Sequence, residues 1–259
     1  MQQLRVSVRQ AGTVESNAAN ILSSLARGLP ELSPALCRHD GTFAIAASGP
    51  SLPQFVDEIK RERENGRPIC AINGAHDFLC DNGLEPDLFL SVDPRETIVP
   101  NTKRKNQNTI YLLASRCHPA LFDHLSDCKV MLWHSWSYEK ECEAFREKGK
   151  AAIGGGTTSG LRAINVAYVM GFRKVVLYGM DSCLADDRKT KRFTGEIADK
   201  QILDVIVGGK RFWCNPPMAQ QANEFQELYS AMPDLTIEAK GDGLIATILQ
   251  ERRKRGLPA

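Results

Sequence analysis

Short apolar segments alternate with amphipathic, helix-like segments through the first two thirds of this chain. The apolar runs occupy residues 43–47, 69–73, 87–93, 109–115, 129–134 and 174–181, and helical periodicity marks residues 52–63, 138–148 and 159–170 between them. Strands buried on both faces by helices show such near-continuous apolar runs, and the alternation is typical of parallel sheets. The sequence therefore predicts an α/β, Rossmann-like fold with a mostly parallel sheet covered by helices on both faces.

The segments on either side of this alternation predict additional elements. Residues 13–28 have the spacing of a helix, and a short helix is expected at 74–80. Beyond residue 181, the charged stretch 185–196 predicts a mobile loop or a lid over a cleft. A hairpin turning at Gly208-Gly209, helices at 218–232 and 244–255, and a short strand at 235–238 complete the C-terminal part.

We predict one domain over residues 1–259. Its parts are an N-terminal helical extension (1–40), a Rossmann-like core (41–183), and a C-terminal region of lid loop, hairpin and helices (184–259). The 259 residues, 42% of them hydrophobic and 25% charged, suffice for one large core.

Charge and hydropathy narrow the class of protein. The formal net charge is only +2, which argues against a general nucleic-acid partner, since such domains carry a strongly basic face. No apolar run is long enough to cross a bilayer, and the N-terminal residues lack the apolar core of a signal peptide. The eight cysteines include no CxxC pair, which favours reduced thiols over disulfides or zinc. We therefore expect a cytoplasmic protein.

Polar residues stand where several predicted strands end. The first strand is followed by Ser48 to Ser51, the second by Asn73, the third by Asp93, and the strand at 174–178 by Gly179-Met180-Asp181. Ligands of parallel sheets bind beyond the carboxyl ends of the strands, so we expect a polar cleft there. Turn formation alone also places Gly and Asp at strand ends, which is the alternative explanation.

The stretch GGGTTSG, residues 154–160, directly precedes the predicted helix at 159–170. Glycines let a backbone approach a ligand, and the N–H groups and dipole of a helix N-terminus attract anions. The stretch is neither a Walker-type phosphate loop, which ends in Gly-Lys-Ser/Thr, nor GxGxxG. The alternative is that Thr158 or Ser159 only caps the helix.

Three segments in order resemble the MptE-like family, the archaeal type of 6-hydroxymethylpterin diphosphokinase and its uncharacterised relatives. They are SGPSL at 48–52, AINGAHDFLCDNGLEPDLFLSVDP at 71–94 and GGTTSGLRAINVAYVMGFRKVVLYGMD at 155–181. The resemblance covers roughly residues 41–183 and implies a Rossmann-like transferase that uses a nucleotide.

The same layout is more distantly similar to bacterial sialyltransferases that use CMP-sialic acid. Those enzymes carry a catalytic histidine late in the chain, whereas none of the five histidines here follows Gly154. They also typically lack an acid at the end of the third strand, where this chain has Asp93. A transferase with this sequence would therefore need a group other than a late histidine to activate the hydroxyl of its acceptor.

The resemblance implies roles for specific residues. Gly49, Pro50 and Ser51 would form the first turn over the nucleotide, and Asn73 would bind its sugar or phosphate. The phosphate oxygens would be held by Gly155, Gly156, Thr157, Thr158 and Ser159. Asp93 and Asp181 would be the catalytic carboxylates and would share a Mg²⁺ ion, which prefers oxygen ligands. Ordinary strand-end turns are the alternative for both aspartates.

Three functional hypotheses follow. The first is a Mg²⁺- and nucleotide-dependent transferase that moves diphosphate from ATP to a hydroxymethylpterin-like or other small hydroxylated acceptor. The second is a glycosyltransferase that uses a nucleotide sugar, and the third is a non-catalytic nucleotide-binding protein. Arg162 and the basic residues at 188–192 are further candidates for contact with phosphate, with solvated surface positions as the alternative. The sequence leaves homo-oligomerisation and the identity of the acceptor open.

Overall fold

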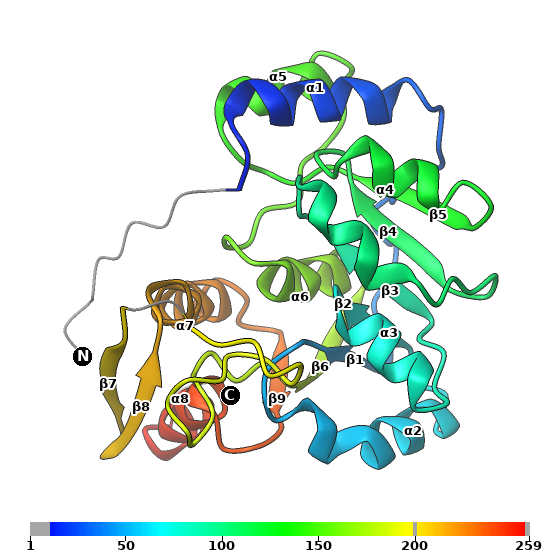
Figure 1. Cartoon of the computed structure of the whole chain (residues 1–259). Helices are drawn as coiled ribbons and strands as arrows, with labels where there is room; N and C mark the ends of the chain where they lie inside the picture. Colours follow the sequence, from blue (N-terminus) through cyan, green and yellow to red (C-terminus); the bar gives the residue numbers. More distant parts are fainter. Residues whose placement is uncertain (1–10, 199–200, 257–259) are drawn as a thin grey trace.

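A seven-stranded, fully parallel sheet forms the centre of the molecule (Figure 1). The computed structural model describes residues 11–198 and 201–256. The strand order is β5-β4-β3-β2-β1-β6-β9. The strands are β1 (His39–Ala46), β2 (Ile69–Ile72), β3 (Leu88–Ser91), β4 (Ile110–Ala114), β5 (Lys129–Trp133), β6 (Phe172–Tyr178) and β9 (Thr236–Ala239). The predicted fold class is confirmed.

The chain reverses its direction of strand addition at β1. Strands β2 to β5 are added on one side of β1, whereas β6 and then β9 are added on the other. In such sheets the crevice between the first strands of the two directions is the usual place for a ligand. The fold therefore directs attention to the carboxyl ends of β1 and β6.

Helices cover both faces of the sheet. The helices are α1 (Val14–Leu25), α2 (Val56–Glu64), α3 (Ala75–Asp81), α4 (Pro119–His124), α5 (Glu139–Arg146), α6 (Ser159–Val169), α7 (Pro216–Ser230) and α8 (Leu244–Lys254), with 3₁₀ turns η1 (Leu52–Phe55) and η2 (Glu96–Thr102). Side chains of a strand alternate between faces. Accordingly, Phe43 and Ile45 of β1 share one apolar cluster with residues of α6, α7 and α8. Ala44 and Ala46 share another with residues of α2 and α3.

The N-terminal helix α1 packs on α5, far along the sequence (Figure 1). Thr13 caps it through a reciprocal hydrogen bond with Ser16, which satisfies two otherwise unpaired donors. Ile21 lies in a small apolar cluster with Cys142 and Phe145. From residue 11 onward, where the structure describes it, the predicted N-terminal extension (1–40) contains the helix α1; its residues 1–10 lie outside the described residues.

The C-terminal residues contribute to the sheet as well as to its cover. Strands β7 (Leu203–Val207) and β8 (Lys210–Cys214) form a separate antiparallel hairpin, turning at Gly208-Gly209 as predicted. Helix α7 follows, and β9 then pairs in parallel with β6. The segment predicted as an extension therefore supplies the seventh strand of the central sheet.

The charged stretch 185–196, expected as a mobile loop or a lid, lies within a segment, 184–198, that has local structure of its own. An antiparallel bridge joins Thr190 to Ile197, and the carboxylate of Asp187 accepts hydrogen bonds from the backbone N–H groups of Lys189 and Thr190. The backbone N–H of Phe193 donates to the carbonyl of Ser48 over 3.3 Å. The segment is thereby attached to the turn that follows β1.

Candidate active site

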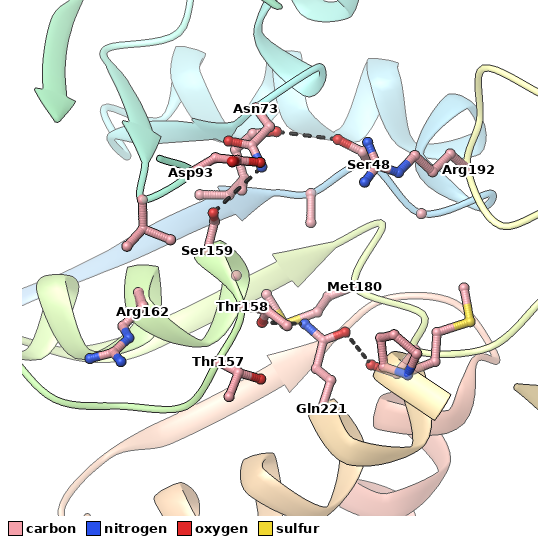
Figure 2. A pocket seen from close by; sticks show the side chains of 18 of the residues that line it. Ser48, Asn73, Asp93, Thr157, Thr158, Ser159, Arg162, Met180, Arg192 and Gln221 are labelled. Atoms are coloured by element: carbon pink, nitrogen blue, oxygen red, sulfur yellow. Dashed lines mark hydrogen bonds between the residues drawn. The ribbon is translucent and has the colours of Figure 1, made fainter. Parts of the chain in front are cut away.

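A cavity of about 520 Å³ opens at the carboxyl ends of β1, β2, β3 and β6, which is the switch point of the sheet. Its lining includes Gly49 and Pro50 after β1, Asn73 after β2, Asp93 after β3, and Asp181 after β6. The N-terminus of α6 completes the wall with residues 157–160 (Figure 2). Segments distant in the sequence therefore meet around one polar cavity.

The first turn, Ser48 to Ser51, is held against the end of β6. The carboxylate of Asp181 accepts hydrogen bonds from the backbone N–H of Ser51 at 3.0 Å and from its hydroxyl at 2.6 Å. A Cβ atom on Gly49 would lie 2.3 Å from Oδ2 of Asp181 and 2.4 Å from the carbonyl oxygen of Gly179. Only glycine fits at position 49, because the two strand-end turns approach so closely.

Asp181 is almost completely buried. Its exposed fraction is 5%, and burial raises its pKa, although the two hydrogen bonds from Ser51 act in the opposite direction. Both oxygens are engaged by Ser51. The arrangement joins the ends of β1 and β6 through one buried carboxylate.

Asn73 occupies a strained position beside the cavity. Its φ of +49° lies in the left-handed region, which asparagine tolerates better than most residues. Its Nδ2 donates to the hydroxyl of Ser159 over 3.5 Å, while its Oδ1 is buried without a hydrogen-bond partner among the described residues. Strain and an unsatisfied buried acceptor together are characteristic of functional positions.

The glycine-rich turn before α6 has a structural role. Gly155 and Gly156 adopt φ values of +109° and +77° and are not among the residues that line the cavity. Thr158 caps the helix, since its Oγ1 accepts a hydrogen bond from the backbone N–H of Leu161 over 3.3 Å. The capping that the sequence left as an alternative is therefore present.

Glu224 of α7 occupies part of the helix N-terminus. Its Oε2 accepts hydrogen bonds from the backbone N–H of Thr157 at 2.8 Å and from the hydroxyl of Thr157 at 2.9 Å. Among the described residues, none accepts a hydrogen bond from the backbone N–H of Ser159 or Gly160. These two N–H groups are the donors that α6 offers to a ligand.

Gln221, one turn earlier on α7, bridges two walls of the cavity. Its Nε2 donates to Oγ1 of Thr158 at 2.8 Å, and its Oε1 accepts from the hydroxyl of Ser182 at 2.7 Å (Figure 2). The sequence analysis did not identify Gln221 or Glu224. Nothing in the local sequence of α7 indicates them, because only tertiary packing brings this helix to the start of α6.

Several cationic side chains face or support the cavity. Arg95, Arg162, Lys191 and Arg192 are among its lining residues. Arg162 is 6% exposed and donates to the carbonyl oxygens of Trp136 at 2.6 Å and Ile153 at 2.8 Å. Burial, together with the neighbouring charge of Arg116, lowers its pKa to about 10. The guanidinium still carries its charge at neutral pH.

The two aspartates predicted to bind Mg²⁺ are both engaged by protein donors. Arg95 contacts both carboxylate oxygens of Asp93, from Nε at 2.9 Å and from Nη2 at 2.5 Å, while Ser51 occupies Asp181. Within residues 11–198 and 201–256, no group of three or more His, Cys, Asp and Glu side chains is placed to hold a metal ion. The two carboxylates by themselves therefore do not make up a Mg²⁺ site, which takes more oxygen ligands than this pair supplies.

The structure thus brings eight predicted site residues to one cavity: Gly49, Pro50, Asn73, Asp93, Thr157, Thr158, Ser159 and Asp181. Ser51 lies behind this wall and binds Asp181, and Gly155 and Gly156 shape the turn outside it. None of the helices in the described part of the chain is both long and apolar enough to span a bilayer.

The chain is similar in fold to solved structures of other proteins. The fold is similar to a MAf glycosyltransferase from Magnetospirillum magneticum AMB-1, with a TM-score of 0.71 and 13% identity. That match covers 91% of this chain and 38% of the other, so this chain spans well under half of that protein's length. A mammalian sialyltransferase matches with a TM-score of 0.42 and 11% identity, over 89% of this chain and 80% of the other.

The sequence itself gives a family assignment. It matches none of the curated proteins. The family model described as "6-hydroxymethylpterin diphosphokinase MptE-like" matches residues 15–187, which is more than half of the chain. This match begins at the second residue of α1 and includes every later element as far as β6. The chain belongs to the MptE-like family.

Proposed function

We propose that this protein is a nucleotide-dependent transferase that moves a group from a phosphorylated donor to a small hydroxylated acceptor. The observation that carries the proposal is the cavity at the switch point, which is lined by Ser159 and Gly160, whose backbone N–H groups have no acceptor among the described residues. A helix N-terminus attracts phosphate through these N–H groups and its dipole. Arg95, Lys191 and Arg192 add positive charge to the same cavity.

Asp93 is the side chain that we assign to the acceptor. Only 14% of its side chain is exposed, and it lines the same cavity as Asn73 and Ser159 (Figure 2). Arg95 holds both of its oxygens and so fixes its orientation. In this role Asp93 accepts the proton of the attacking hydroxyl, a function for which the described lining offers no histidine.

The family description points to one version of the reaction, the transfer of diphosphate from ATP to a pterin-like alcohol. Phosphoryl and diphosphoryl transfer rest on positioning and on neutralising the charge of the phosphates. In this version the N–H groups of α6 and the cationic side chains would bind the donor's phosphates. AMP would be the leaving group and the second product.

A second candidate is glycosyl transfer from a nucleotide sugar. Two observations favour it. No aromatic side chain is among the described residues that line the cavity, so a pterin ring finds no stacking partner there. The carboxylates of Asp93 and Asp181 are bound by protein donors, and they do not form the oxygen site that a metal-dependent phosphotransfer would use. A sugar acceptor has no aromatic ring to stack, and transfer from a CMP-linked sugar does not require a metal.

The proposal is tested first by ligand-induced stabilisation. A ligand that binds the native state raises the unfolding temperature, so we expect at least one of ATP, CTP, CMP, UDP and GDP to do so. The variant Asn73→Gly removes the side chain without adding backbone strain, and it should reduce the shift. Asn82→Ala is the control, because Asn82 lies on the exposed end of α3. No shift with any of the five nucleotides would refute the proposal.

Turnover assays separate the two versions. Release of AMP from ATP in the presence of 6-hydroxymethylpterin supports diphosphate transfer, whereas release of CMP from a CMP-sugar supports glycosyl transfer. In either assay Asp93→Asn should lower kcat by about 10²–10⁴-fold, which is the usual contribution of a general base. Wild-type-like turnover by Asp93→Asn would exclude the assigned role of Asp93.

A further inference from the structure

The segment 184–198 brings two basic side chains to the cavity from outside the predicted phosphate site. Lys191 and Arg192 both line the cavity, whereas Lys189 in the same segment is exposed and does not. Only 19% of the Lys191 side chain is exposed, which is low for a lysine on a surface loop. Arg192 is labelled in Figure 2 on the side of the cavity that also carries Ser48.

Both basic side chains are paired with the same carboxylate. Nζ of Lys191 lies 2.8 Å from Oε1 of Glu196, and Nε of Arg192 lies 3.1 Å from Oε2. Burial of Glu196 acts to raise its pKa, but Lys191, Arg192 and the more distant Arg95 outweigh it and lower the pKa. Three cations that line the cavity thus act on Glu196, which is not itself among the lining residues.

The backbone of the segment is fixed, so that exchange of partners needs only side-chain rotation. Besides the hydrogen bond from Phe193 to Ser48, the Phe193 ring packs on Phe78 with ring centroids 4.5 Å apart. The backbone N–H of Lys191 donates to the carbonyl of Glu196 at 2.8 Å. Lys191 and Arg192 therefore stay beside the cavity whichever anion they bind.

We propose that Lys191 and Arg192 bind the phosphate oxygens of the nucleotide donor, and that Glu196 holds the two cations in place until the donor arrives. This inference rests on the proposed function and assigns the residues that recognise its donor. The side chains of Glu196 and Arg192 are each 45% exposed, and ion pairs at such exposure contribute little stability, so Glu196 can be displaced by a stronger anion. A diphosphate carries more negative charge than one carboxylate and presents several oxygens, which suits a lysine and the planar donor fork of an arginine.

Removal of the two cations and removal of the carboxylate should have opposite effects on the affinity for phosphate. In Lys191→Ala/Arg192→Ala, affinity for inorganic pyrophosphate and for the nucleotide that stabilises the wild type most should fall by at least about tenfold, because two charge-assisted contacts are lost. In Glu196→Gln, affinity for both probes should rise about threefold or more, because the competing carboxylate is gone. Lys189→Ala should bind both probes as the wild type does.

Isothermal titration calorimetry at one fixed ionic strength measures these affinities, and unfolding temperatures verify that each variant is folded. If the wild type and the double variant bind both probes equally, the assignment of Lys191 and Arg192 is overturned while the proposed function stands. A Glu196→Gln protein that binds no more tightly than the wild type would overturn the role of Glu196. If the wild type binds pyrophosphate through Lys191 and Arg192 but binds no nucleotide, the proposed function fails and the anion site remains.

Discussion

Asp181 and Ser51, separated by 130 residues in the sequence, are joined by two hydrogen bonds at the switch point of the sheet. The carboxylate is buried, and the serine contributes both its backbone N–H and its hydroxyl. The pair therefore sets the distance between the turns that follow β1 and β6. These turns form two walls of the cavity, so the pair links the stability of the fold to the shape of the site.

A double-mutant cycle on this pair should reveal the coupling. Ser51→Ala and Asp181→Asn should each lower the free energy of unfolding by about 1–3 kcal/mol, because hydrogen bonds to a charged group are stronger than neutral ones. The double variant should be less destabilised than the sum of the single variants by about 1 kcal/mol or more. Urea denaturation measures all three values. Strict additivity would show that the two residues act independently.

The raised pKa of Asp181 makes part of the stability pH-dependent. The folded protein holds this proton more tightly than the unfolded chain, so the proton-linked stability is fully present below the ordinary pKa of 3.8 and is lost as the pH rises through the higher folded pKa. Asp181→Asn cannot titrate. Relative to this variant, the wild type should therefore become less stable as the pH rises from below 3.8 towards neutrality. Denaturation curves at a series of pH values test this, and a constant difference would contradict it.

Gly49→Ala should disturb the same contact by sterics. The new methyl group would lie 2.3 Å from the Asp181 carboxylate and 2.4 Å from a backbone carbonyl, and overpacking of this kind costs about 1–3 kcal/mol. Gly41→Ala, in strand β1 just before this turn, is the control, since the nearest atom to its added methyl group is 3.9 Å away. Thermal unfolding of both variants gives the comparison. Equal stability would mean that the turns separate without cost.

Glu224 should be needed to hold the turn before α6. Without its carboxylate, the N–H and hydroxyl of Thr157 lose their acceptor, so the N-terminus of α6 is less well positioned for a phosphate. We expect Glu224→Ala to raise the dissociation constant of the nucleotide about tenfold, because the turn that leads to the N–H groups of Ser159 and Gly160 loses the charge-assisted contact that orders it. Glu227→Ala changes an exposed position on the same helix and is the control. Affinity unchanged in Glu224→Ala would show that Glu224 is dispensable for binding.

Metal dependence separates two ways of neutralising the donor's phosphates. The sequence predicts Mg²⁺ on Asp93 and Asp181, but Arg95 and Ser51 already bind these carboxylates in the structure. We therefore expect nucleotide affinity in EDTA to stay within about threefold of that in millimolar MgCl₂ at matched ionic strength. A loss of more than about tenfold in EDTA, restored by Mg²⁺, would support the metal prediction instead.

The periodicity of the sequence was sufficient to predict the sheet, because strands buried on both faces leave long apolar runs. The sequence analysis missed two helical elements because they have no clear apolar pattern. Helix α4 is only six residues long, and the 3₁₀ turn η2 contains Pro100, so neither shows a helical apolar pattern. The first half of β1 was also missed, since its exposed residues pair with β6 without an apolar signal.

The site was predictable where it depends on strand ends and not where it depends on tertiary packing. The topology of a parallel sheet brings Asn73, Asp93 and Asp181 to one edge, and that could be reasoned from the sequence. The side chains that bind these groups inside the protein could not be predicted from the sequence. Arg95, Ser51 and Glu224 occupy atoms that the sequence would leave free for a metal or a phosphate, and only packing determines that they do.

The pairing of β9 with β6 determines which residues a chimera of this protein must contain. The family match ends at residue 187, yet β9 and the two α7 side chains that bind the start of α6 lie beyond it. A chimera that transplants only residues 15–187 would leave β6 as an exposed edge strand, and the start of α6 would lose its hydrogen bonds with α7. The shortest segment that could be transplanted must therefore include the strand that pairs with β6, and so it extends at least through Ala239.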